Sequence, residues 1–475
     1  MELLLKLPRP EYPSNPEVLL SSLAWELSGK NTTLGYEKEK GLVYKKVKPS
    51  RFMVTPIIPE GNSTDWTPEM LSIFHKAGLR SDRNEHAIIN ALLQNLIGTK
   101  PARASAYSCV PLNYNMLFFQ DLRGICKKNN PARLGKVFNT LYSFGNLGKN
   151  SRASAAKLWC QVLINSTKKN KDEIFLSKAS KSLIGSKMSP DENLVDTSDF
   201  QSPPNWFPKN GTPYHWFASA WNSLCDEEWL DVMPTRRWVD WSSCVLRTAL
   251  GLCYLWESRF YRNIAFALVN EVSDSQDIFG LNEPLLSWKG KDTKVSARSI
   301  NSHLNSLVAD GQKARRVLES LEGLNLPAPL KDSHSIGDII NAYKKQISSS
   351  QKAQLAGCFN QPRDSDSQAT HETIVYCLTN RNEWGESADL YSLLKTIKKV
   401  NRVVEPASEW LAVIASLNTN KYTHTSTLSD LKAELRTMCI GFSKSVLVSE
   451  LERLGLSHIL NDADDAIEIK AAFLE

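Results

Sequence analysis

The residues best suited to chemistry in this chain are lysines and arginines that gather in one block. Between Asp121 and Lys187, fourteen lysines and arginines stand against three acidic residues, although the net charge of the whole chain is only +6. The remainder of the chain is therefore acidic overall. Clustered cationic side chains neutralise phosphates and release their counterions, so this block favours binding to a nucleic-acid backbone.

Two helices are expected to present this charge. The apolar face of the first is predicted to consist of Leu134, Val137, Phe138 and Leu141. Its opposite face carries Arg133, Lys136 and Thr140. The second helix, within 151–165, buries Ala155, Leu158, Trp159 and Val162 and turns Arg152 and Lys157 outward. Because Phe138 and Trp159 fall on buried faces, contact with the phosphate backbone is favoured over base stacking.

Ten basic residues are the candidate contacts with nucleic acid: Arg123, Lys127, Lys128, Arg133, Lys136, Lys149, Arg152, Lys168, Lys169 and Lys171. The glycine-containing turn between the two helices is not a phosphate-binding P-loop, because Ser143 stands where the first glycine is required. DNA is favoured over RNA as the partner. Two alternatives stay open, namely an acidic partner protein and a solvated face with no partner.

A second candidate site lies in a segment rich in tryptophan. Seven of the thirteen tryptophans fall between Trp206 and Asn270, and such a density of indole rings indicates a core or a large interface. Apolar residues at three- and four-residue steps predict a long helix that starts with Thr235 as its N-cap. The candidate contacts with a partner protein are Arg236, Arg237, Trp238 and Trp241. Alternatively, the two arginines pair with acids upstream: Asp226, Glu227 and Glu228.

The sequence carries no motif of an enzyme, a metal site or a bound cofactor. The nine cysteines are scattered without a CxxC pair, and the eight histidines lie far apart. We therefore expect buried free thiols, no metal and no cofactor. A Glu-x-Lys run lies between Glu37 and Lys40, but the upstream aspartate that a nuclease needs is not evident. A non-catalytic role is favoured, and a nuclease with an unrecognised site stays the minor alternative.

The chain is expected to fold into several modules, since 475 residues are too many for one hydrophobic core. These modules must position the residues named above. The predicted modules are a mixed segment (1–65), a basic helical domain (66–188), an acidic Pro/Ser linker (189–205), a Trp-rich helical core (206–330), a helical domain (331–418) and a C-terminal module (419–475). Further helices are expected over 296–323 with a bend near Gly311, and over 336–347, 387–399 and 406–417. The polar stretch 361–372 is expected to separate helices.

The C-terminal module resembles a winged helix. Its apolar pattern predicts a helix over 428–438, a tight turn, a second helix capped by Ser443 and ending at Gly455, and a final strand. This resemblance implies that the second helix enters the major groove of DNA. Between Ser426 and Glu475, however, five basic residues face nine acidic ones. That balance favours contact with protein over contact with DNA for this module.

The predicted fold is mainly α, a multi-module helical protein with a small N-terminal β-hairpin around Gly41 and a winged-helix-like domain at the end. With 42% hydrophobic and 23% charged residues, the composition is that of a globular protein. No membrane segment and no targeting sequence are read, so the expected location is the cytoplasm. A long helical chain with such a tail is similar to accessory subunits of bacterial anti-phage defence systems. The resemblance implies a non-catalytic subunit that binds nucleic acid, with a purely protein-binding scaffold as the alternative.

Overall fold

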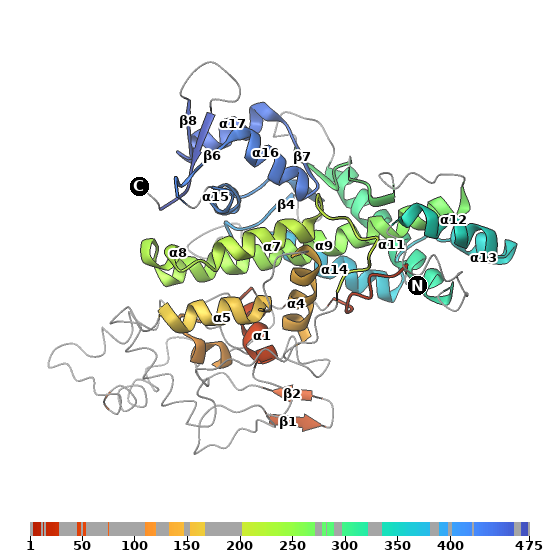
Figure 1. The fold of residues 1–475 in the computed structure, drawn as a ribbon, viewed down its shortest axis with the longest axis horizontal. Helices are drawn as coiled ribbons and strands as arrows, with labels where there is room; N and C mark the ends of the chain where they lie inside the picture. Colours follow the sequence, from red (N-terminus) through yellow and green to blue (C-terminus); the bar gives the residue numbers. More distant parts are fainter. Residues whose placement is uncertain are drawn as a thin grey trace.

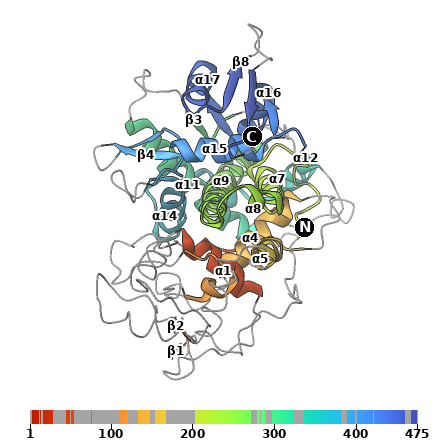
Figure 2. The ribbon, with the colours of Figure 1, turned by 90° about the vertical axis from the view of Figure 1, so that its left-hand side faces the viewer.

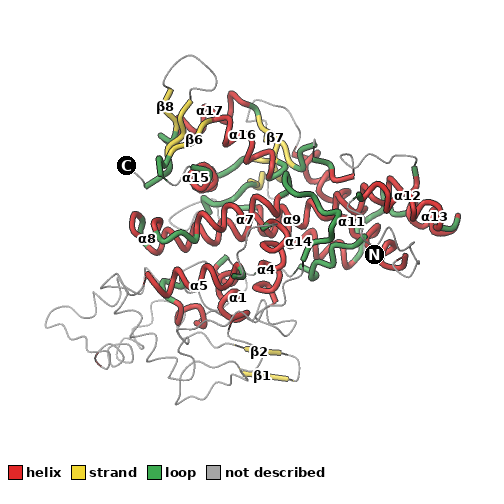
Figure 3. The backbone as a smooth tube through the Cα atoms, in the orientation of Figure 1, coloured by secondary structure: helices red, strands yellow, loops and turns green. Residues whose placement is uncertain are grey.

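The fold is mainly helical, as the sequence predicts, and its few strands are short (Figures 1 and 3). The computed structural model describes residues 3–10, 13, 16–27, 45–48, 51–53, 75, 110–119, 133–146, 153–166, 202–270, 278–281, 283–288, 297–321, 335–380, 389–397, 401–419, 422–459 and 467–473. Buried side chains from all the larger of these segments join one continuous hydrophobic cluster. The predicted domain boundaries stay predictions.

Helix α9, Thr235–Val269, is the axis of the molecule (Figure 1). Its 35 residues span roughly 50 Å at the ordinary helical rise. Trp238, Trp241 and Trp256 on this helix are fully buried, so its tryptophans build the core. The cap differs by one residue from the prediction, because Pro234 is the N-cap and Thr235 the first helical residue. The carbonyl of Pro234 accepts the N–H groups of Arg237 and Trp238.

Several helices pack around α9. They are α7 (Pro213–Leu224), α8 (Glu228–Val232), α11 (Ala297–Leu321), α12 (Ile336–Gln346), α13 (Ser349–Ala356) and α14 (Ser365–Leu378). Helix α11 continues through Gly311, where a bend was expected. A Cβ atom at Gly311 would lie 2.1 Å from the carbonyl oxygen of Ser258 on α9. The glycine therefore permits close helix packing. The predicted end at Gly323 lies outside the described residues.

The N-terminal part covers one side of this bundle (Figures 1 and 2). It contains α1 (Glu17–Leu27), the 3-10 helix η2 (Tyr114–Phe119), α4 (Arg133–Gly145) and α5 (Ala155–Ser166). Leu5 and Leu7 of the first segment are buried, and the N–H of Leu5 donates to the Tyr261 hydroxyl on α9 over 3.0 Å. The segment 3–10 is thereby fastened to the central helix.

The C-terminal module lies on the opposite side of α9 (Figure 1). It contains α16 (Leu428–Thr437), α17 (Lys444–Arg453) and strands β6 (Thr425–Thr427), β7 (Ile440–Phe442), β8 (Ser457–Ile459) and β9 (Ile467–Lys470), and α15 (Ser408–Leu417) directly precedes it. Three strands form an antiparallel sheet in the order β6-β9-β8. Strand β7 pairs in parallel with β3 (Leu286–Trp288), so the turn between α16 and α17 is joined to a segment far upstream.

Two expectations about this half of the chain were wrong. The predicted helix over 387–399 is replaced in part by strand β4 (Leu394–Ile397), which pairs antiparallel with β5 (Asn401–Val404). The polar stretch 361–372 does not separate helices, since most of it lies in α14. Asp364 caps that helix by accepting the N–H of Ser367 over 2.9 Å, and a good cap outweighs polar composition.

Two further predicted helices are present in the structure. Helices α12 and α15 match the predicted segments 336–347 and 406–417 to within two residues. Strands β1 (Lys45–Lys48) and β2 (Arg51–Met53) pair antiparallel, while Gly41, around which a hairpin was expected, lies outside the described residues. None of the helices in the described part combines the length and apolar character that a bilayer crossing needs.

Candidate nucleic-acid interface

Of the ten basic candidates, the structure describes Arg133 and Lys136, both on α4. The other eight lie outside the described residues: Arg123, Lys127, Lys128, Lys149, Arg152, Lys168, Lys169 and Lys171. Lys157, which the sequence turned outward, is described on α5 and is half-buried. The geometry of the candidate interface is therefore that of the α4 and α5 surfaces.

The apolar faces of these two helices fill the core. Leu134, Val137, Phe138 and Leu141 on α4 are fully buried. On α5, Trp159 is fully buried, and its indole stacks on Trp238 with a centroid distance of 5.1 Å. The expectation that Phe138 and Trp159 are closed to bases is thus confirmed. Thr140, expected on the outer face, is instead 5% exposed, because its hydroxyl donates to the Lys136 carbonyl and turns inward along the helix.

Lys136 and Lys157 lie at the junction of the two helices. The side-chain oxygen of Asn139 accepts the N–H of Ala156 over 3.0 Å. This bond sets the start of α5 against the α4 face that carries Lys136, one turn before Asn139. Lys136 is exposed, and among the described residues neither lysine has a carboxylate partner. Both ammonium groups can therefore contribute to a positive surface.

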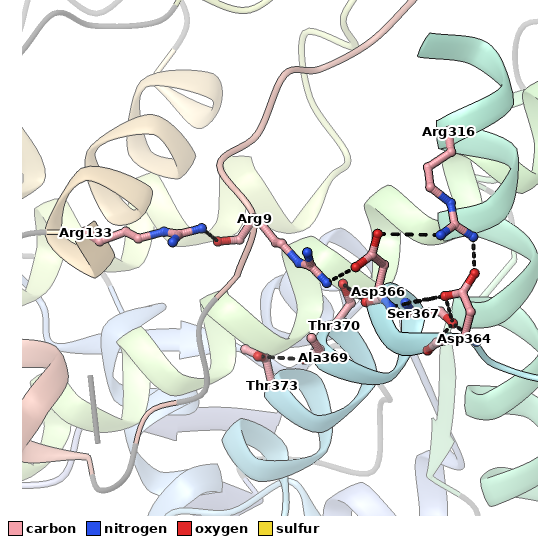
Figure 4. A network of polar contacts seen from close by, with 9 residues as sticks. All are labelled: Arg9, Arg133, Arg316, Asp364, Asp366, Ser367, Ala369, Thr370 and Thr373. Atoms are coloured by element: carbon pink, nitrogen blue, oxygen red, sulfur yellow. Dashed lines mark hydrogen bonds and ion pairs between the residues drawn. The ribbon is translucent and has the colours of Figure 1, made fainter. Parts of the chain in front are cut away.

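Arg133 connects this surface to the rest of the fold (Figure 4). Its guanidinium donates to the carbonyl oxygen of Arg9 over 3.1 Å, and Arg9 pairs in turn with Asp366 on α14. Arg316 of α11 bridges Asp366 and Asp364. The hydrogen bond from Ser367 and the charge of Arg316 lower the pKa of Asp364, against the opposing effect of burial. This ionic chain fixes segment 3–10 between α4 and α14.

The four candidate contacts with a partner protein divide into two kinds. Trp238 and Trp241 are 0% exposed, and the Trp238 indole donates to the Leu224 carbonyl over 2.9 Å. Both indoles therefore serve the core of this chain. Arg236 and Arg237 are half-exposed and lie beside them at the start of α9.

The two arginines pair with carboxylates other than those expected upstream. Arg236 pairs with Asp240 one turn later, at 3.3 Å. Arg237 pairs with Glu409 at 3.3 Å and donates to the Tyr391 hydroxyl over 2.8 Å. Burial raises the pKa of Asp240 to about 6, although the charge of Arg236 opposes this shift.

One exposed aromatic ring lies next to Arg237, and a second lies on an adjoining segment. The ring of Phe473 lies 5.8 Å from its guanidinium carbon and is 46% exposed. Tyr422, 87% exposed, belongs to the strand segment that pairs with the Phe473 segment, since the Ala471 N–H donates to the His424 carbonyl. Arg237, Tyr422 and Phe473 together form what we call the aromatic edge. Exposed aromatics beside an arginine are typical of protein interfaces.

The structure brings together charged groups that the sequence analysis did not single out. Arg363, His371 and Arg402 converge near the start of α14 and strand β5. Arg363 and His371 are 8 positions apart, Arg402 lies 31 positions after His371, and the three share no motif, so no known sequence pattern could have identified them. Among the residues that the structure places, no three metal-ligating side chains meet. The seven described cysteines are free thiols, six of them buried, as predicted.

No family of known proteins matches this chain, and no curated protein matches it.

Proposed function

We propose that this chain is a non-catalytic subunit that binds the phosphate backbone of nucleic acid, DNA in preference to RNA, through the basic block. The observation that carries the proposal is the fourteen-to-three excess of basic over acidic residues between Asp121 and Lys187. The ammonium groups of Lys136 and Lys157 support it, because neither is paired with a carboxylate among the described residues. The wider assignment, to a bacterial multi-protein complex that can include anti-phage defence, is part of the same proposal.

The C-terminal module is proposed to be a winged helix. The order from α15 onward is helix, strand, helix, strand, helix, strand, strand. Its three helices followed by two strands support this, as does the pairing of β6 and β8 with the central strand β9. Helix α17 would be the helix presented to a partner. Its outer face carries Ser445, Ser449 and Glu452, and Arg453 is paired with Glu450. Such a face is poorly suited to phosphates, so the module is assigned to protein contact.

Fluorescence anisotropy with labelled DNA and RNA of equal length tests the main proposal. For the wild-type chain we expect binding that weakens steeply between 50 and 200 mM salt, since each phosphate contact releases counterions. A variant with Lys127, Lys128, Lys168 and Lys169 changed to Glu is expected to lose at least tenfold in affinity. The variant Lys136→Glu with Lys157→Glu is expected to lose less, and to flatten the salt dependence.

The matched control is Lys345→Glu with Lys352→Glu, which makes the same charge change on exposed residues of α12 and α13. It is expected to bind nucleic acid as the wild type does. Equal losses in the control and in the Lys136/Lys157 variant would mean that net charge, rather than this surface, drives binding. Retention of full affinity by the fourfold variant would remove the proposal.

A purely protein-binding scaffold is the second candidate, and the aromatic edge favours it. Phe473 exposes its ring beside Arg237, and Tyr422 exposes its ring on the adjoining segment. Such side chains dominate binding energy where they become buried. Size-exclusion chromatography with light scattering, on the chain co-expressed with proteins of neighbouring genes, tests this function. We expect a complex that Tyr422→Ser with Phe473→Ser weakens and that nuclease treatment leaves intact.

A further inference from the structure

Three side chains with nitrogen donors converge beside α14. Arg363 lies in the loop just before the helix, and its Nη1 contacts Nδ1 of His371, two turns into α14. Arg402 reaches the same place from strand β5, where it stands opposite Thr396 of β4. Figure 2 shows β4 and α14 on one side of the molecule, next to α11. Two guanidinium groups and an imidazole are thus held close by three separate elements.

No carboxylate among the described residues neutralises this cluster. The nearest acids in sequence, Asp364 and Asp366, are paired with Arg316 and Arg9 (Figure 4). Neither Arg363 nor Arg402 forms an ion pair within the described part of the chain. Nε of Arg402 is buried and has no hydrogen-bond partner there. A buried donor left without a partner costs free energy, so the cluster is unfavourable unless an acceptor is bound.

The protonation of His371 supports this interpretation. Burial, together with the charges of Arg363 and Arg402, lowers its pKa to about 3. The ring is therefore neutral near pH 7. A neutral ring that accepts from Arg363 at Nδ1 carries its proton on Nε2. Burial likewise lowers the pKa of Arg402, helped by the charge of Arg363, against the opposing effect of Tyr376.

We propose that Arg363, His371 and Arg402 form a binding site for one phosphate group. The guanidinium fork matches the spacing of phosphate oxygens, and two such forks compensate both charges of a phosphate dianion. His371 is 8% exposed and both arginines are half-buried, so the two guanidinium groups are partly accessible from solvent. Two positive charges suit the dianion of a terminal phosphate, as in inorganic phosphate, a nucleoside monophosphate or a 5′-phosphorylated oligonucleotide.

Thermal unfolding with a matched series of anions tests the site on the full chain. Sodium phosphate, adenosine monophosphate and a 5′-phosphorylated tetranucleotide are compared with sodium chloride, adenosine and the unphosphorylated tetranucleotide at equal ionic strength. A ligand that binds only the folded state raises the melting temperature as its concentration rises. We expect this rise for at least one phosphorylated member, and its identity reports whether the phosphate belongs to a small molecule or to a nucleic-acid end.

Two variants assign the response to the cluster. Arg363→Gln with Arg402→Gln is expected to abolish it, while phosphate-free stability stays equal to that of the wild type or rises, because like-charge repulsion is removed. Arg402→Lys keeps the charge without the fork and is expected to weaken phosphate binding at least tenfold, measured by isothermal titration calorimetry. Arg453→Gln, at an exposed arginine paired on α17, is the control and is expected to respond as the wild type does.

Two outcomes would overturn the proposal. A phosphate response of the same size in the double variant places binding elsewhere. A double variant that is less stable without phosphate, combined with a wild type that responds to no member of the series, makes the two arginines structural. Because the variants leave the basic block unchanged, loss of the phosphate response is separable from loss of nucleic-acid binding by that block.

Discussion

Arg247, which is buried, and Arg402, which is half-buried, lie in opposite electrostatic environments. Arg247 on α9 is 3% exposed. It pairs with both carboxylate oxygens of Asp389 at 3.0 and 2.9 Å and donates to the carbonyls of Cys377 and Thr379, each over 3.1 Å. Arg402 on β5 has one cationic neighbour, Arg363, and one neutral imidazole neighbour, His371, and its buried Nε has no partner within the described residues.

We interpret Arg247 as a charge that stabilises the structure and Arg402 as part of the proposed phosphate site. A buried ion pair with every donor satisfied is costly to break. It fixes the end of α14 and the Asp389 segment to the central helix. Like charges placed together lower stability, and proteins keep such arrangements at sites of function. The contrast leads to four predictions about stability, from the largest effect to the smallest.

The largest effect is expected on breaking the satisfied pair. Asp389→Asn leaves the Arg247 guanidinium buried without its counter-charge. Loss of one partner of a buried ion pair costs about 3–5 kcal/mol. Urea unfolding followed by tryptophan fluorescence measures the loss. A change below about 1 kcal/mol, typical of surface pairs, would contradict the role given to Arg247. Arg453→Gln, at an exposed arginine paired on α17, is the control.

Glu257, also on α9, is a buried charge whose cost depends on pH. Burial raises its pKa to about 7, although Arg315, Gln312 and Tyr261 oppose the shift. An unfolded glutamate titrates near pH 4.5, so stability is full below that pH and is lost as the pH rises to about 7. Glu257→Gln removes this loss. Relative to the wild type, it should be unchanged at pH 4.5 and stabilised by roughly 3 kcal/mol at pH 8.

Urea unfolding curves from pH 4.5 to 8 give this comparison. A Glu257→Gln variant that tracks the wild type at every pH would show that the carboxyl group titrates normally. Glu452→Gln on α17, where the side chain is exposed, is the control and should leave the pH dependence unchanged.

His371 should give the opposite slope. Its pKa is lowered to about 3, whereas an unfolded histidine titrates near pH 6.5. Stability is therefore full above pH 6.5 and is lost as the pH falls towards 3, by about 2 kcal/mol at pH 5. His371→Gln should remove that loss, and added phosphate should reduce it in the wild type. The readout is unfolding at pH 5 and 7, and equal slopes in the two proteins would contradict the prediction.

The smallest effect is expected at the unsatisfied arginine. Arg402→Gln should shift the unfolding free energy by no more than about 1 kcal/mol, in the stabilising direction, because a repulsive charge and a buried donor are removed. The measurement is urea unfolding in phosphate-free buffer. A loss comparable to that of Asp389→Asn would place Arg402 with Arg247 among the structural arginines.

Local pattern was enough to determine much of the helical framework. Apolar spacing identified the buried faces of α4 and α9, because a helix must turn one stripe of side chains away from water. It also gave α12 and α15 within two residues. Charge counting found the basic block, since net charge is a sum over residues and needs no coordinates.

Local pattern failed where a distant contact decided the outcome. Segment 394–404 has enough apolar residues for either state, and pairing between β4 and β5 selects the strand. The sequence predicts a bend at Gly311, but the glycine instead packs against Ser258. Because Ser258 is 53 positions away, local pattern could not identify this contact.

In this chain the residue types and their spacing determined which helix faces are buried and where the excess of positive charge lies. Only the tertiary structure decided which charges meet. Arg247 pairs with Asp389, whereas Arg402 lies near Arg363, because distance in space decides which side chains interact. Coulomb energy falls with that distance, and separation along the chain does not predict it.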